Sequence, residues 1–419
     1  MKWFRVAVFG AMLVVGCASD AQQKAQDGAK ALAACDMRTA HQDFSDAYSL
    51  DGNDPQIALA FALTDLALLA EDPALETLRP RFGFTAPFDT TFLWKKGGFM
   101  DLASQKTTTC GALGDLAQAS IAHPSLAKTN PTPFLDTLDK TLTFGDLRDA
   151  GLALSPRLDK ISKALETAAK GVGDEGVSLS GGCGTGTMTL QKPELLALAG
   201  ALSLLHASFQ LAATYDGSLR VHPLFMQIAG ETGEETDLVT DLNAAFLHVK
   251  DASQMNAMVP IWQHAFDLFG QAIAAAQAVT KTPANAVIDW TSFPKPILVD
   301  AAQLATAAHD AFTASTPTAI PFLSPAVTVD GASLVSSPLE LAPLTPAAWS
   351  LSGTDIAFTF DGMKAKLGAR FTPDPFTSNA SYSWSFVDDI SNATDASPNW
   401  GSATFDPGKR FSSGFACQP

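Results

Sequence analysis

The chain has 419 residues, of which 47% are hydrophobic and 17% are charged, and its formal net charge is −16 at neutral pH. These fractions are typical of a chain that buries a core, and they exclude intrinsic disorder. A negative field repels phosphate backbones, so the charge also argues against nucleic-acid binding. The length allows two or three ordinary domains or one extended helical array.

The first seventeen residues have the pattern of an export signal. Lys2 and Arg5 form a positive flank, and Val6 to Val15 is an uncharged run that is too short to cross a bilayer as a helix. The run ends in Val14-Val15-Gly16-Cys17, which resembles the lipobox of bacterial lipoproteins. The alternative is an ordinary signal peptide with an incidental cysteine.

The lipobox resemblance implies a membrane address. Residues 1–16 would be removed, and Cys17 would carry a diacylglyceryl group and an acyl chain such as palmitate. One acyl chain holds a protein to a membrane only marginally, whereas two or three make release negligible. In that family an Asp after the cysteine retains the protein in the inner membrane. Ala18 therefore implies the outer membrane, with the protein attached to it through the N-terminal lipid.

Four further cysteines, Cys35, Cys110, Cys183 and Cys417, remain after lipidation. Outside the cytoplasm disulfides persist, and four cysteines allow three connectivities. Glycines beside Cys110 and Cys183 favour that pair, which leaves Cys35 for Cys417. Free buried cysteines that pack as small hydrophobes are the alternative.

After the signal segment, the sequence predicts a series of helices. Apolar periodicity and capping residues predict helices over residues 20–34, 37–50, 55–70 and 73–80. Pro55 follows the capping candidates Asn53 and Asp54, and Pro73 follows Asp72, which is the expected chemistry of a helix start.

Within these helices, Gly28, Ala40, Phe44 and Ala47 resemble a tetratricopeptide repeat. The resemblance implies two closely packed helices whose gap Phe44 fills, and a surface that binds peptides or partner proteins. It covers residues 21–80, because a second, degenerate copy follows after about 34 residues. Three positions where the family prefers large apolar side chains hold Lys24, Asp27 and Ala31.

An aromatic cluster follows the repeat-like helices: Phe82, Phe84, Phe88, Phe92 and Trp94. Such a cluster either lines a ligand cavity or covers the open end of a helical pair, and we favour the second interpretation. If a cavity exists there, the helix over residues 194–215 and its His206 would complete the lining.

Further helices are predicted over residues 112–122, 133–142, 155–170, 194–215, 236–249 and 259–281. The helix over 194–215 is long and apolar enough to cross a bilayer, but His206, Ser208 and Gln210 interrupt it. We therefore expect a central helix that is buried all round, with His206 as a hydrogen-bonded core histidine. The Gly-rich residues 171–189 lack phosphate-loop spacing, so we expect a structural hairpin or loop there, with 187–191 as a strand.

After Thr282 prolines become frequent, and one helix is predicted over residues 300–314. Period-two alternation then predicts a hairpin, with strands over 356–360 and 363–371 joined by Asp361-Gly362. A further strand is predicted over 381–386. The fold class that follows is mainly α, built from antiparallel helical hairpins, with a small antiparallel β element at the end.

The sequence therefore predicts five segments: a signal peptide (1–16), a lipidated N-terminus with repeat-like helices (17–80), a helical continuation (81–281), a Pro-rich connection (282–348) and a small β region (349–419). No hydrolase elbow, paired-cysteine motif or zinc-binding helix motif is present, so no catalytic residue, metal or cofactor is assigned. The leading functional hypothesis is a non-catalytic scaffold of the cell envelope with a protein or peptide partner. A carrier of a small, apolar ligand is the alternative, and an envelope hydrolase is the third hypothesis.

Overall fold

The computed structural model describes residues 19–83, 137–173, 175–180, 187–229, 233–244, 248–293, 295–324, 326–339, 349–352, 355–358, 369–374, 382–384 and 403–405. These residues are mainly helical, and two small antiparallel three-stranded sheets lie in the C-terminal part. The predicted fold class is thus confirmed.

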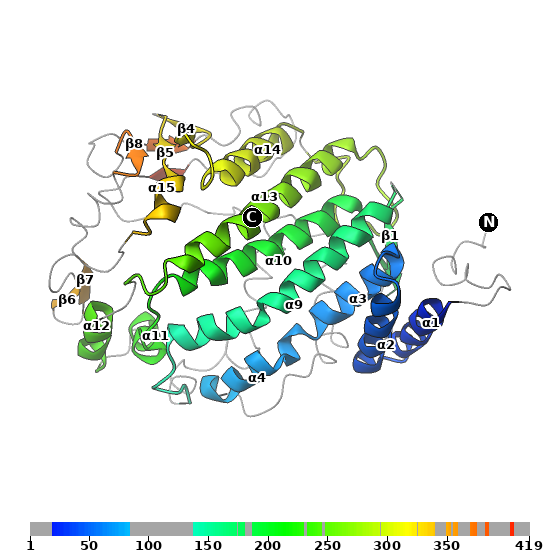
Figure 1. Ribbon diagram of the computed structural model, residues 1–419, viewed down its shortest axis with the longest axis horizontal. Helices are drawn as coiled ribbons and strands as arrows, with labels where there is room; N and C mark the ends of the chain where they lie inside the picture. The colour runs from blue at the N-terminus through cyan, green and yellow to red at the C-terminus, as the bar shows by residue number, and fades with distance from the viewer. Residues whose placement is uncertain are drawn as a thin grey trace.

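The principal helices form a sequential array. They are α1 (Asp20–Ala33), α2 (Met37–Leu50), α3 (Pro55–Ala67), α9 (Phe144–Gly171), α10 (Lys192–Ala213), α13 (Ser253–Ala278) and α14 (Lys295–Asp310). Each of them packs against the next one in this order. In Figure 1 they follow one another across the molecule from the blue end to the yellow-green end.

Side-chain caps start the first helices where the sequence predicts them. The side chains of Ser19, Asp36, Asp54 and Asp72 each accept a hydrogen bond from a backbone N–H in the first turn that follows. These bonds satisfy donors that have no partner within the helix. Asp72 caps the short helix α4 (Pro73–Leu78).

The α1–α2 pair packs as the repeat-like residues predict. Ala40, Phe44 and Ala47 are fully buried between the helices. A Cβ atom built on Gly28 would lie 3.0 Å from the Phe44 ring, so the ring fills the space that this glycine leaves. Lys24 occupies a position where tetratricopeptide repeats prefer a large apolar side chain. Its ammonium group forms ion pairs across the two helices with Asp43 and Asp46, at 3.2 and 3.1 Å.

Two helices begin earlier than their prolines suggested. The prediction that α9 starts at Ser155-Pro156 is wrong, because Thr143 and Asp146 form a capping box at the start of α9, roughly three helical turns earlier. Pro156 and Pro260 lie inside α9 and α13. Both prolines are exposed, so water can reach the carbonyl groups that they leave without a helical partner. Residues 137–142, predicted as part of a helix, form turns.

Helix α10 is central but is not buried all round. It packs between α9 and α13, and Ser162 of α9 hydrogen bonds to Ser203 across the first interface at 3.0 Å. One side nevertheless faces outward: Leu205 is 41% exposed, and Ala201, Ser208 and Ala212 are exposed with it. By length and composition alone α10 could cross a membrane, but 39% of its apolar window is buried inside the protein.

Smaller elements complete the described chain: η2 (Leu69–Glu71), η3 (Arg79–Phe82), α11 (Val221–Ala229), α12 (Glu235–Ala244), α15 (Gly331–Ser336), β1 (Val177–Ser180), β2 (Thr187–Leu190), β3 (Thr318–Ala319), β4 (Leu323–Ser324), β5 (Thr328–Val329), β6 (Trp349–Ser352), β7 (Asp355–Phe358), β8 (Phe371–Thr372), β9 (Tyr382–Trp384) and β10 (Ala403–Phe405). The predicted hairpin before α10 is confirmed, with Val177 opposite Leu190. The predicted strand at 381–386 is β9, which pairs with β10 and β4.

The later predicted hairpin lies only in part within the described residues. Strand β7 pairs with β6, which precedes it, in the register Trp349–Phe358. The predicted turn at Asp361-Gly362 and most of the strand over 363–371 lie outside the described residues. Helices α11 and α15 were not predicted, and α14 begins at Lys295 rather than at residue 300.

Candidate functional site

A charged cluster centred on Asp65 joins the N-terminal helices to α9. Asp65 is the single carboxylate in the apolar helix α3, and its side chain is 6% exposed. Two nitrogens of the Arg157 guanidinium, on α9, contact this carboxylate: Nε lies 2.8 Å and Nη2 2.6 Å from Oδ1. The same guanidinium donates to the Asp65 carbonyl oxygen at 3.0 Å and pairs with Asp72 at 3.0 Å. A charged hydrogen-bond fork of this kind fixes the geometry between two helices.

His41 of α2 lies at the edge of the cluster. Its Nε2 is 3.6 Å from Asp65 Oδ1. Burial lowers the pKa of His41, and the nearby Asp65 only partly opposes that shift, so the imidazole is neutral near pH 7. Its buried Nδ1 atom has no hydrogen-bond partner among the described residues.

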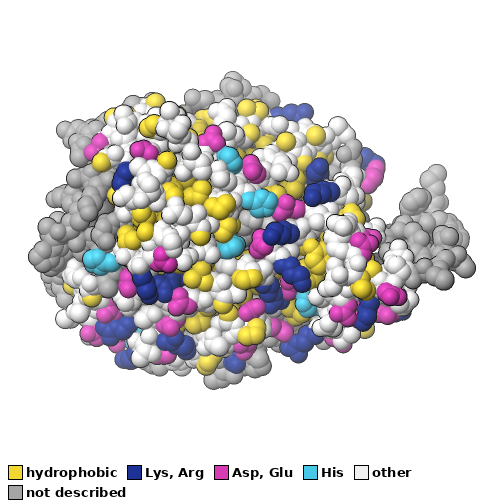
Figure 2. Space-filling model, viewed as in Figure 1, with side chains coloured by type: hydrophobic (Ala, Val, Ile, Leu, Met, Phe, Trp, Pro, Cys, Tyr) yellow, Lys and Arg dark blue, Asp and Glu magenta, His cyan; other side chains and the backbone are white. Residues whose placement is uncertain are grey.

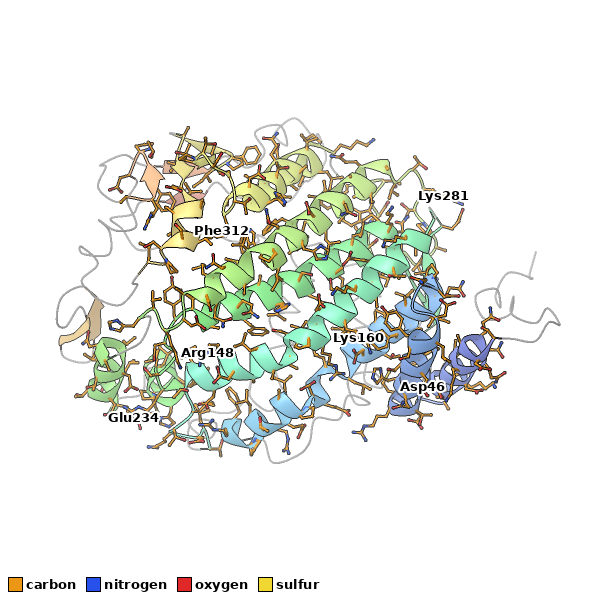
Figure 3. All side chains as sticks on the ribbon, viewed as in Figure 1. Asp46, Arg148, Lys160, Glu234, Lys281 and Phe312 are labelled. Atoms are coloured by element: carbon orange, nitrogen blue, oxygen red, sulfur yellow. The ribbon has the colours of Figure 1, made fainter. Side chains whose placement is uncertain are left out.

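An aromatic stack covers one side of the cluster. Tyr48 and Phe61 are parallel with ring centroids 4.6 Å apart, and the Lys160 ammonium lies 4.4 Å above the Phe61 ring. A cation placed over a ring face is attracted by the ring quadrupole. Figure 3 shows Lys160 on α9, beside α3.

This arrangement is suited to holding helices together rather than to bond cleavage. A hydrolytic His–Asp pair needs a nucleophile that hydrogen bonds to the histidine. In the described part of the chain, no hydroxyl or thiol group bonds to His41. Arg157 already occupies the carboxylate that would orient the imidazole. The Asp65 cluster is therefore a polar contact that holds the N-terminal helices against α9.

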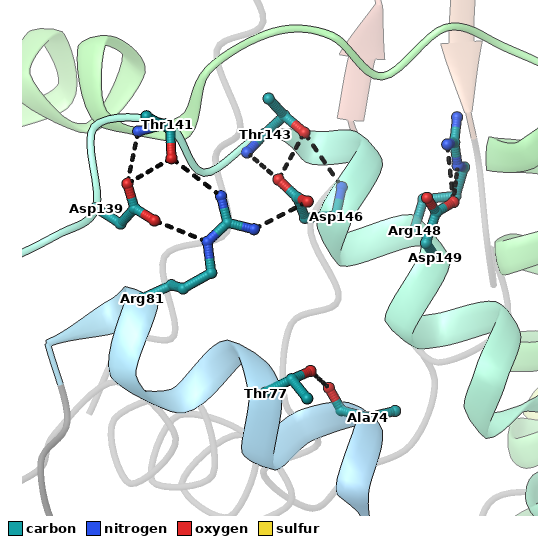
Figure 4. Close-up of polar contacts among 9 residues, drawn as sticks. All are labelled: Ala74, Thr77, Arg81, Asp139, Thr141, Thr143, Asp146, Arg148 and Asp149. Atoms are coloured by element: carbon teal, nitrogen blue, oxygen red, sulfur yellow. Dashed lines mark hydrogen bonds and ion pairs between the residues drawn. The ribbon is translucent and has the colours of Figure 1, made fainter.

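A second charged cluster ties η3 to the start of α9 (Figure 4). Arg81 lies between two carboxylates, with Nε 2.8 Å from Asp139 and Nη1 2.9 Å from Asp146. The hydroxyl and backbone N–H of Thr141 also donate to Asp139, at 2.7 and 2.8 Å. These bonds, first that from the Thr141 hydroxyl and then that from Arg81, lower the pKa of Asp139 to about 2. The carboxylate is thus ionised throughout the neutral range.

A third polar cluster lies at α11 and α12. His222 is 3% exposed, and its Nδ1 lies 2.6 Å from Glu234. Glu234 also pairs with Lys140 at 3.0 Å, and Arg220 forks onto Asp241 nearby. Like the Arg81 cluster, it joins segments that are distant in the chain.

Two members of the predicted ligand cavity, Phe82 and His206, lie within the described residues. Phe82 packs against a small cluster that includes Leu78, Leu142 and Val221, with no residue of α10 in it. His206 is half-buried on α10, with Gln210 3.5 Å away, and burial lowers its pKa. The other predicted lining residues lie outside the described residues: Phe84, Phe88, Phe92 and Trp94. The cavity therefore stays a prediction.

The lipidation and disulfide residues are also untested. Cys17, Cys110, Cys183 and Cys417 lie outside the described residues. Cys35 lies just after α1, in a left-handed backbone conformation with φ of 64°. Both predictions stand as they were made.

Within the described ranges, no group of three or more His, Cys, Asp or Glu side chains is arranged to hold a metal ion. Comparison with known protein families, curated proteins and solved structures finds no match to this chain. The Asp65 cluster was not among the predicted sites. The sequence nevertheless contains an indication of it. Residues 55–70 are almost all apolar, and a single aspartate in such a helix implies a buried partner of opposite charge.

Proposed function

We propose that this protein is a lipid-anchored, non-catalytic scaffold of the cell envelope that binds a protein partner through its helical array. The lipobox-like residues support the anchor, and the repeat-like packing of α1 and α2 supports the array. Arrays in which each helix contacts mainly its neighbours present broad surfaces to partners. Because architecture alone does not determine function, the partner would be bound by a particular surface of the array.

The observation that carries the proposal is the outward side of α10. Ala201, Leu205, Ser208 and Ala212, here called the α10 face, recur every three or four residues and carry no charge. Figure 2 shows hydrophobic side chains gathered where α10 and α13 lie side by side, with acidic, basic and histidine side chains around them. An apolar centre with a polar rim is typical of a protein-binding surface.

The anchor gives the first testable prediction. Replacing Cys17 by serine removes the sulfur that would form the thioether, so the variant should lose palmitate labelling and leave the membrane fraction. The measurement is radiolabelled palmitate incorporation together with fractionation, and Cys35→Ser is the control that should keep the label. Normal labelling of the Cys17→Ser variant would refute the lipid anchor.

The α10 face gives the second prediction. A photocrosslinking amino acid in place of Leu205 should produce a discrete protein adduct in intact cells. Leu50 is the matched control, because it is the same residue type, is 59% exposed and lies at the end of α2, away from the α10 face. Adducts at Leu50 that equal those at Leu205 would show that exposure alone causes crosslinking, and the proposed surface would be wrong.

A further inference from the structure

A hollow of about 540 Å³ lies between α13, α14 and the strand β3, away from the α10 face. Gln277 comes from α13, Val299 and Thr306 from α14, and Thr318 from β3. Its volume lies in the range of small-molecule sites, roughly 300–1,000 Å³. Figure 1 shows α14 beside α13 at the upper edge of the molecule, with β4 and β5 nearby.

None of the side chains that line this hollow carries a charge, although the chain as a whole has a net charge of −16. The lining combines alanine and valine with the amides of Gln277 and Gln303 and with threonine hydroxyls. A charged ligand would find no opposite charge in this lining. The lining therefore selects an uncharged molecule with an apolar body.

The two threonines of the hollow, Thr306 and Thr318, differ in the hydrogen bonding of their hydroxyl groups. The Thr306 hydroxyl donates to the Ala302 carbonyl oxygen of its own helix at 3.0 Å. The Thr318 hydroxyl oxygen is buried and has no hydrogen-bond partner among the described residues. A buried polar group without a partner is costly, so Thr318 offers a hydrogen bond to whatever occupies the hollow.

The backbone of β3 adds a second polar group. In the described sheet β3 is an edge strand, because β5 lies between it and β8. The Ile320 N–H bonds to the Val327 carbonyl oxygen at 2.8 Å, so Ile320 points its backbone groups toward β5. Because successive residues of a strand alternate, the N–H and C=O of Ala319 point away from β5, and Ala319 lines the hollow. The outer edge of β3 thus presents both a donor and an acceptor beside the hollow.

We infer that this hollow binds a small uncharged molecule in which an apolar body carries an amide or hydroxyl group. The polar group of the ligand bonds to the Thr318 hydroxyl and to the edge of β3, and the apolar body lies against Val299 and the alanines of α14. This inference is independent of the scaffold proposal, because it uses none of the residues of the α10 face.

The test uses ε-caprolactam as the probe, since this ring combines an apolar body with an uncharged amide. In an NMR titration of the full chain, caprolactam should shift the signals of Ala302, Thr306 and Ala319. Cyclohexylammonium and cyclohexanecarboxylate have a similar size but carry a charge, so they should not shift these signals.

The two threonines supply a matched pair of variants. Thr318→Val should weaken caprolactam binding about fivefold, the factor that one net hydrogen bond contributes. Thr306→Val should leave the affinity unchanged, because that hydroxyl is already engaged within α14. Ala302→Phe should fill the hollow and abolish binding, while an unchanged thermal unfolding midpoint shows that the variant is folded. Equal affinities for Thr318→Val and Thr306→Val, or shifts located elsewhere, would overturn the inference.

Discussion

Replacing Phe44 by alanine should lower the free energy of unfolding by about 3–5 kcal/mol. Phe44 is 1% exposed and fills the space beside Gly28 between α1 and α2, so its removal leaves a cavity that the fully buried Ala40 and Ala47 cannot fill. Urea unfolding of the chain without residues 1–17 measures the change.

Two variants of the same region act as controls. Asp54→Ala removes only the cap that accepts from Gln56 and Ile57, so it should cost about 1 kcal/mol. Ala40→Leu overpacks the same interface and should cost about 1–3 kcal/mol. If Phe44→Ala is no more harmful than Asp54→Ala, residues 21–55 do not pack as a tetratricopeptide-like pair.

Replacing Arg157 by methionine should destabilise the protein by about 3–5 kcal/mol, because it removes the guanidinium that pairs with the buried Asp65 carboxylate and leaves only His41, 3.6 Å away, beside that charge. This loss of stability comes from the buried Asp65 charge that remains, and not from the energy of the missing Arg157–Asp65 ion pair. The double variant Asp65→Leu/Arg157→Met should therefore recover most of the loss, since an apolar pair of similar volume often replaces a buried ion pair without cost.

Lys163→Met is the control on the same helix. Lys163 pairs with Asp159 at 2.7 Å, but the two side chains are 65% and 45% exposed, so the change should be within about 0.5 kcal/mol. A double-mutant cycle in urea gives the coupling between Asp65 and Arg157. If the double variant is as unstable as Arg157→Met, the stranded charge is not the cause of the loss.

The sequence predicted the local parts of the fold well. Caps and periodicity located α1, α2 and α10 to within about two residues, because those signals lie inside the elements themselves. The same reasoning failed at Pro156 and Pro260, where a proline was interpreted as a helix start although an exposed proline is tolerated inside a long helix.

The clusters that join distant segments could not be predicted in the same way. Asp65 meets Arg157, and Arg81 meets Asp139, only because the array brings α3 and η3 beside α9. No local sequence feature near Asp65 or Arg81 identifies the partner of that residue. The hollow beside β3 is equally nonlocal, since it depends on how α13, α14 and the sheet are placed.

The order of the array has a consequence for how the chain acquires its structure. Helices α1, α2 and α3 follow one another directly, whereas residues 68–143 separate α3 from α9, its next neighbour. The α3–α9 contact must therefore wait until the intervening residues have been made, while the helix pairs on either side form from more local contacts. During synthesis at about 5–20 residues per second, α3 stays without its α9 neighbour for roughly 5–20 s, until α9 has been made. That interval is when an unfinished chain most needs protection from aggregation.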